Sequence, residues 1–73
     1  MVVTQATGDS HDYALGKVAG IWVAQQGLDL DSDSLDLEAN EFYERAITYI
    51  VVSRIPFVAG FKEAYVGYKN GLM

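Results

Sequence analysis

Apolar residues recur at helical spacing in the first third of the chain. One face of the resulting helix carries His11, Leu15, Val18 and Trp22, at i, i+4, i+7 and i+11. Asp9 and Ser10 have side chains that cap a helix start, and Gly27 accepts the left-handed turn that commonly ends one. The pattern therefore predicts a helix over residues 10–26, preceded by a non-helical lead over residues 1–9.

The opposite face of this first helix carries little charge. Lys17 is its one clearly hydrophilic residue, while Val23 and two glycines lie beside it. Gly16 and Gly20 each lower intrinsic helicity by about 1 kcal/mol relative to alanine, so the run 17–23 also allows interpretation as a strand. If the segment is helical, its apolar residues predict cover on two sides.

A second helix is predicted over residues 36–54, with Ser34 or Asp36 as its cap. Winding it at about 100° per residue gives a broad apolar arc. The arc contains Ala39, Phe42, Tyr43, Ala46, Ile47, Tyr49, Ile50 and Val51. Glu41 and Arg45 are spaced for a favourable i, i+4 pair on the polar side. Such a wide arc needs more cover than one neighbouring helix provides.

A third helix is predicted over residues 57–70. Pro56 disfavours a helical conformation in Ile55 but fits the first turn of a new helix, so Arg54-Ile55-Pro56 indicates a tight turn. The second and third helices are then expected to form a C-terminal antiparallel helical hairpin. The fold class predicted is all-α: a small three-helix domain, residues 1–73, that is expected to be oligomeric.

Two stripes lie side by side on the third helix. One is aromatic and the other, the small-residue seam, consists of small side chains at i, i+4, i+7 and i+11. The stripes contain Phe57, Phe61, Tyr65 and Tyr68, and Gly60, Ala64, Gly67 and Gly71. Glycine costs helix stability, so the seam predicts close approach of another backbone, either the second helix of the same chain or another copy. The interface prediction comprises Gly60, Ala64, Gly67, Gly71, Tyr65 and Tyr68.

Composition narrows the function classes. A chain of 73 residues and 8.0 kDa buries only about 60% of its unfolded surface, so it benefits from a neighbour. The absence of cysteine removes disulfides and thiolate metal sites. A net charge of −5 argues against direct binding to nucleic acid or anionic lipid and favours a basic partner surface. Arg54 and Pro56 interrupt the most apolar run, so a membrane span is not expected, and without a recognisable signal peptide the expected location is cytoplasmic.

An acidic connecting loop is predicted over residues 28–36. Asp29, Asp31 and Asp33 match the first, third and fifth places of a calcium-binding loop. Ser34 stands where the turn needs glycine, and Asn40 stands where a bidentate carboxylate is needed. These aspartates are weak metal candidates at most, and a solvated connector is the simpler interpretation.

No motif indicates catalysis. His11 is the single histidine, no phosphate-binding glycine loop or nucleophile elbow occurs, and no cofactor is expected. The predicted function is a non-enzymatic protein–protein interaction module, an acidic homo-oligomeric adaptor or inhibitor that binds itself and another protein. These features are also typical of phage-encoded accessory proteins. The alternatives are a structural subunit of a filament, virion or membrane-associated complex, and a weak calcium-binding module.

Overall fold

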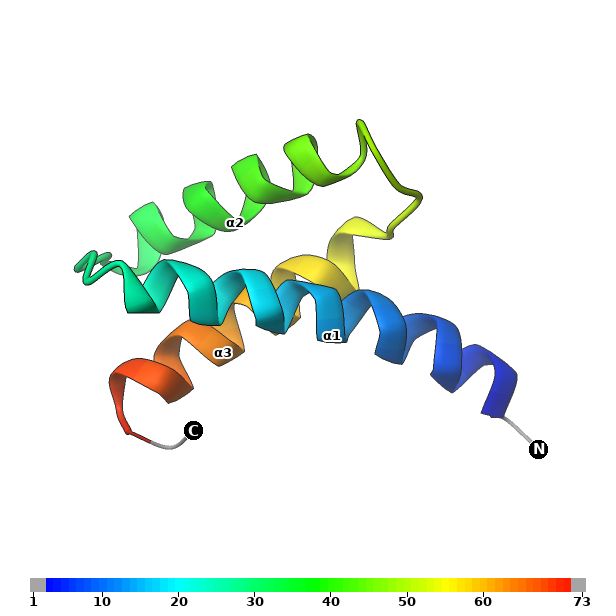
Figure 1. The fold of residues 1–73 in the computed structure, drawn as a ribbon, viewed down its shortest axis with the longest axis horizontal. Helices are drawn as coiled ribbons and strands as arrows, with labels where there is room; N and C mark the ends of the chain where they lie inside the picture. Colours follow the sequence, from blue (N-terminus) through cyan, green and yellow to red (C-terminus); the bar gives the residue numbers. More distant parts are fainter. Residues whose placement is uncertain (1–2, 72–73) are drawn as a thin grey trace.

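The computed structural model describes the backbone of residues 3–71 and the side chains of residues 11–71. The described chain is all-helical and contains no strand. Its elements are α1 (Val3–Gln25), α2 (Ser32–Ala46) and α3 (Arg54–Lys69) (Figure 1). The predicted three-helix, all-α class is confirmed, and the alternative of a strand over 17–23 is wrong. Packing of α1 against α3 stabilises the helix by more than the low helical propensity of Gly16 and Gly20 destabilises it.

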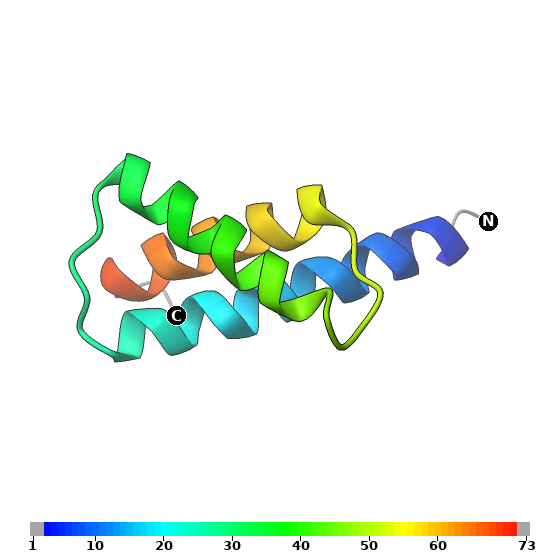
Figure 2. The same cartoon turned by 90° about the horizontal axis from the view of Figure 1, so that it is seen from above.

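The helices form an up, down, up arrangement. α1 and α3 run in the same general direction, and α2, which lies on one side of them, runs in the opposite direction (Figure 1). Viewed from above, α2 lies over both of the other helices (Figure 2). The main packing partner of α3 is α1, with a smaller contact between α3 and α2. The element nearest in sequence is therefore not the one that covers most of α3.

α1 begins at Val3, inside the segment predicted as a non-helical lead. Its first turns extend beyond the other two helices (Figures 1 and 2). Once a helix is nucleated, each further residue adds one backbone hydrogen bond, and residues 3–9 contain no proline to stop it. The predicted end is close to the observed one, since Gly27 has φ of +79° and Gln25 is the last helical residue.

α2 begins four residues earlier than predicted. Asp31 is its N-cap, and the Asp31 carboxylate accepts a hydrogen bond of 2.8 Å from the Ser34 backbone N–H. Starting the helix at Ser32 places Leu35 in the core, with 6% of its surface exposed. The sequence offers several residues that cap a helix equally well, so burial of Leu35 decides among them.

α2 ends at Ala46, eight residues before the predicted end. Ile47 to Ile50 form turns in which the Thr48 hydroxyl donates to the Arg45 carbonyl oxygen at 2.6 Å. β-Branched residues dominate 47–52 and have lower helical propensity than the residues before them. Leaving the helix lets Val52 turn into the core, so the connection is seven residues long instead of a tight turn at Pro56.

α3 begins at Arg54, and Pro56 lies in its first turn, where a missing N–H costs nothing. Ser53 is the N-cap residue but makes no side-chain capping bond. Asp12, from α1, accepts a hydrogen bond of 3.0 Å from the Ser53 N–H. Its negative charge lies at the positive end of the α3 dipole, so α1 stabilises the start of α3.

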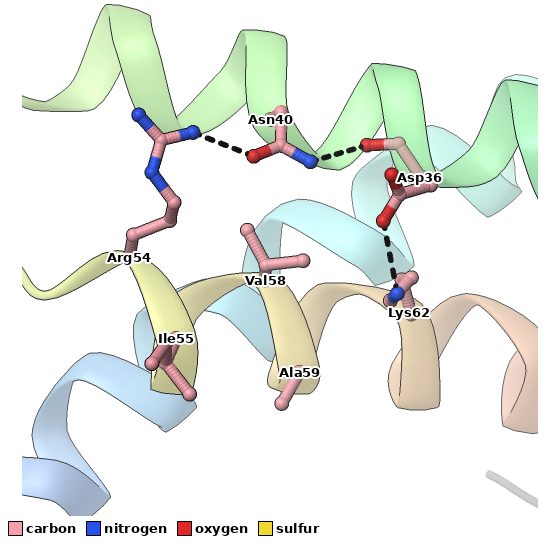
Figure 3. A pocket seen from close by; sticks show the side chains of 7 residues that line it. All are labelled: Asp36, Asn40, Arg54, Ile55, Val58, Ala59 and Lys62. Atoms are coloured by element: carbon pink, nitrogen blue, oxygen red, sulfur yellow. Dashed lines mark hydrogen bonds and ion pairs between the residues drawn. The ribbon is translucent and has the colours of Figure 1, made fainter.

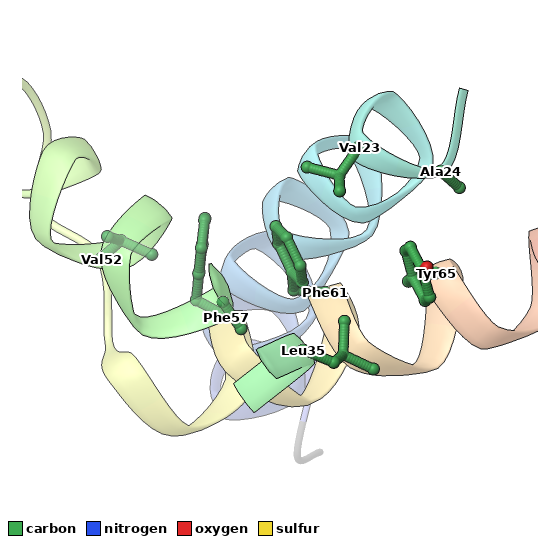
Figure 4. Packing of buried hydrophobic residues seen from close by; sticks show 8 residues of the cluster. Val23, Ala24, Leu35, Val52, Phe57, Phe61 and Tyr65 are labelled. Atoms are coloured by element: carbon green, nitrogen blue, oxygen red, sulfur yellow. The ribbon is translucent and has the colours of Figure 1, made fainter. Parts of the chain in front are cut away.

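The core is small and centred on α3. Phe61 is fully buried and points towards Val23 of α1, while Leu35 approaches from α2 (Figure 4). The Phe61 ring also packs against the Phe42 ring with centroids 5.3 Å apart. Phe57 and Tyr65 flank Phe61 on the same face, so the predicted aromatic stripe supplies most of the buried ring area.

Glycines bring α1 and α3 into backbone contact. A Cβ atom added to Gly16 or Gly20 would overlap the carbonyl oxygen of Phe57 or Phe61. From the other side, a Cβ added to Gly60 would overlap the carbonyl oxygen of Tyr13. The two helices therefore pack closely because three positions lack side chains. The helical cost of these glycines is offset by this contact.

A buried tyrosine holds the first connection against α3. The Tyr65 hydroxyl donates to the Leu28 carbonyl oxygen at 2.6 Å and accepts from the Leu30 N–H at 2.9 Å. Lys69 reaches the Leu28 carbonyl oxygen at 3.3 Å and pairs with Asp29 at 3.4 Å. Side chains of α3 thus hold the backbone of the acidic connection in place through hydrogen bonds.

Replacing Tyr65 with phenylalanine is expected to lower the free energy of unfolding by about 1–2 kcal/mol, because two partly buried backbone groups lose their partner. Urea denaturation monitored by circular dichroism measures the change. Tyr68→Phe is the matched control, because that exposed hydroxyl makes no hydrogen bond among the described residues. An equal effect in the two variants would contradict the assigned role of the Tyr65 hydroxyl.

Candidate functional site

The predicted interface residues on α3 fall into three environments. Gly60, Ala64 and Tyr65 are buried inside this chain, with Gly60 against α1. Gly67 is half-buried and Tyr68 is exposed. The small-residue seam thus faces α1 at Gly60, whereas the intrachain partner expected from the sequence was the second helix.

Gly71 does not lie in helical register with the seam. α3 ends at Lys69, and Gly71 has φ of +76°, the left-handed conformation that commonly follows a helix. The Gly71 N–H donates to the Tyr68 carbonyl oxygen at 3.0 Å. The spacing that linked Gly71 to Gly60 assumed a helix that continues one turn further than it does.

The three weak metal candidates are not gathered into a site. Asp29 pairs with Lys69, Asp31 caps α2 and Asp33 lies in the first turn of α2. The Ser34 backbone N–H, which donates to the Asp31 carboxylate, lowers the pKa of that carboxyl. Across the described residues, no three histidine, aspartate or glutamate side chains are placed to hold a metal ion. The alternation of aspartates reflects turn and capping chemistry.

A pocket of about 370 Å³ with charged side chains at its edge lies between α2 and α3. Arg54 donates to the Asn40 side-chain oxygen at 2.6 Å, and Lys62 pairs with Asp36 at 3.0 Å (Figure 3). Arg54 also donates to Glu44 at 2.8 Å. Each of these charged groups already has a partner of opposite sign. These exposed ion pairs therefore link α2 to α3, and each contributes little to the free energy of unfolding.

An apolar groove of about 300 Å³ lies between α1 and the C-terminal end of α2. α1 contributes Leu15 and Ala19. α2 and the connection after it contribute Phe42, Arg45, Ala46, Tyr49 and Ile50, and Phe57 lies at the base. Among the described lining residues Arg45 is the one that carries a charge. The guanidinium of Arg45 lies 5.6 Å from the centroid of the Phe42 ring.

The apolar surface continues from this groove along α1. Trp22 packs beside Phe42 with ring centroids 6.0 Å apart, yet 54% of its surface is exposed. Val18 lies between Leu15 and Trp22 at helical spacing and is 68% exposed, while Tyr49 is 87% exposed. We call this continuous surface the apolar face; it comprises Leu15, Val18, Ala19, Trp22, Phe42, Ala46, Tyr49 and Ile50.

The sequence contained two signals for the apolar face, although none of its members stood in the predicted interface. One was the low charge on both sides of the first helix. The other was an arc on the second helix too wide for one neighbour. Both signals concern the same surface, because α1 and the end of α2 lie side by side. The predicted Glu41 to Arg45 ion pair does not form, which leaves Arg45 on the groove without an ion pair among the described side chains.

Comparisons with protein-family models, with curated proteins and with solved structures gave no match to this chain. Within residues 3–71, none of the helices has the length and apolar character required to cross a lipid bilayer.

Proposed function

We propose that this chain is a non-enzymatic protein–protein interaction module and that the apolar face is its contact surface. The supporting observation is that Val18, Trp22 and Tyr49 are exposed on the apolar face, which extends from α1 to the end of α2 and the turns after it. Exposed apolar surfaces that are continuous, instead of scattered single residues, mark interaction sites. Large aromatic side chains beside an arginine are the residue types enriched at such sites.

This proposal is compatible with the role of an adaptor or inhibitor and with the alternative role of a subunit in a larger assembly. Both use the same face, and they differ in whether the product is a discrete complex or an open-ended polymer. The cytoplasmic location and a basic partner remain predictions from sequence and charge. The acidic connection, at the opposite end of α2 from Tyr49, suits contact with a positively charged surface.

Site-specific photocrosslinking tests the proposed function. A photoreactive side chain placed at Val18 or at Tyr49 of the full chain in cells is expected to give a discrete protein adduct. The same group at Ile55, exposed on α3 outside the apolar face, is the control and is expected to give no adduct. Equal yields at all three positions would refute the apolar face as a contact surface.

A further inference from the structure

Resting on the proposed function, we infer that the occupant of the apolar face is a second copy of this chain. The two copies are related by a two-fold axis, with the α2 helices antiparallel. The same patch on each copy then covers the other, as an isologous interface requires.

The large exposed side chains of the face suit such a partner. Aromatic side chains bury about 150–250 Å² each, and Trp22 and Tyr49 are both largely exposed. Val18 and Ile50 extend the same surface. A standard interface buries about 800 Å² per partner, roughly a sixth of the 4856 Å² accessible surface of this chain.

Charge favours a copy of this chain over a basic helix. Arg45 lines the groove, so an occupant with basic residues there would meet a like charge, whereas an acidic residue would pair with it. Glu41 lies one turn before Arg45 on α2, is exposed, and makes no ion pair among the described side chains. In an antiparallel arrangement Arg45 of each copy faces Glu41 of the other, which gives two equivalent pairs.

The antiparallel direction also separates the acidic ends of the two molecules. Asp29, Asp31, Asp33 and Asp36 cluster at the start of α2, away from the end that forms the groove. A two-fold axis near Phe42 and Arg45 directs these ends away from each other. A parallel arrangement would bring them together, and the net charge of −5 per chain would oppose it.

Sedimentation equilibrium over a range of protein concentrations tests the inference. The wild-type chain is expected to give twice its 8.0 kDa mass, and the emission of its single tryptophan, Trp22, is expected to shift to the red on dilution. Val18→Glu is expected to give monomers. Ile55→Glu, on an exposed site outside the apolar face, is the control and is expected to leave the mass unchanged.

Charge exchange tests the register. Arg45→Glu and Glu41→Arg are each expected to raise the dissociation constant by about tenfold or more, and the double variant is expected to restore it. A double variant no tighter than the single ones would overturn the pairing. A wild-type monomer at every concentration would overturn the second copy as occupant. In that event an adduct with another protein at Val18 would still support the proposed function, so the two failures are distinguishable.

Discussion

Gly16→Ala is expected to destabilise the chain by about 2–3 kcal/mol, although alanine is the better helix former by about 1 kcal/mol. The added methyl group would overlap the Phe57 carbonyl oxygen, and that backbone atom has no free rotation to move aside. α1 and α3 must then separate along their main contact. Urea denaturation monitored by circular dichroism measures the loss as a lower transition midpoint at an unchanged slope.

The matched control for Gly16→Ala is Ala14→Gly, two residues away on the exposed side of α1. This reverse exchange is expected to cost about 1 kcal/mol through helical propensity alone. Losses in both directions would show that close helix approach, and not propensity, governs position 16. Stabilisation by Gly16→Ala would contradict the backbone contact between α1 and α3.

Phe61→Ala is the second substitution with a large expected effect, a loss of about 3–5 kcal/mol. Phe61 is fully buried at the centre of α3, and its removal leaves a cavity among side chains from α1 and α2. A chain of 73 residues has a total stability of roughly 4–11 kcal/mol. The variant is therefore expected to lose a large share of its stability, which thermal denaturation measures as a lower midpoint.

Ile55→Ala is the control for Phe61→Ala, because it removes a large apolar side chain from the same helix at an exposed position. A change within about 0.5 kcal/mol is expected. Similar losses in the two variants would place the centre of the core elsewhere on α3.

The number and class of the elements were predictable from periodicity, whereas the ends of α2 were not. Asp31, Ser32, Ser34 and Asp36 are all competent caps, and the choice among them depends on which start buries Leu35. The end at Ala46 depends on Val52 reaching the core. Local patterns do not contain such tertiary requirements.

Which helix packs against the small-residue seam could also not be predicted from local sequence patterns. Gly60 and Ala64 indicated close helix approach, and Gly16 and Gly20 had the same spacing in the first helix. From the sequence, Gly16 and Gly20 were interpreted only as a cost in helical propensity, and Gly60 and Ala64 only as part of an interface. Gly16, Gly20 and Gly60 all serve the contact between α1 and α3, two helices that run in the same direction because α2 returns in the opposite one.

The apolar face was missed for a related reason. Ile47, Tyr49, Ile50 and Val51 belonged to the predicted arc only if α2 continued to residue 54. Because α2 ends at Ala46, these residues leave the helix, and the large ones remain on the surface. The excess of apolar residues was evident from composition, but its location depended on where one helix ends.

The contact between Gly16 and Phe57 joins segments separated by most of the chain. α1 has few contacts with α2, so it has no stable partner until α3 has been synthesised. A ribosome-bound chain that has released only α1 and α2 therefore exposes the future contact surface of α1 for the duration of that synthesis. Folding must close a long loop before its main contact forms, which makes it slower than in bundles built from sequential neighbours.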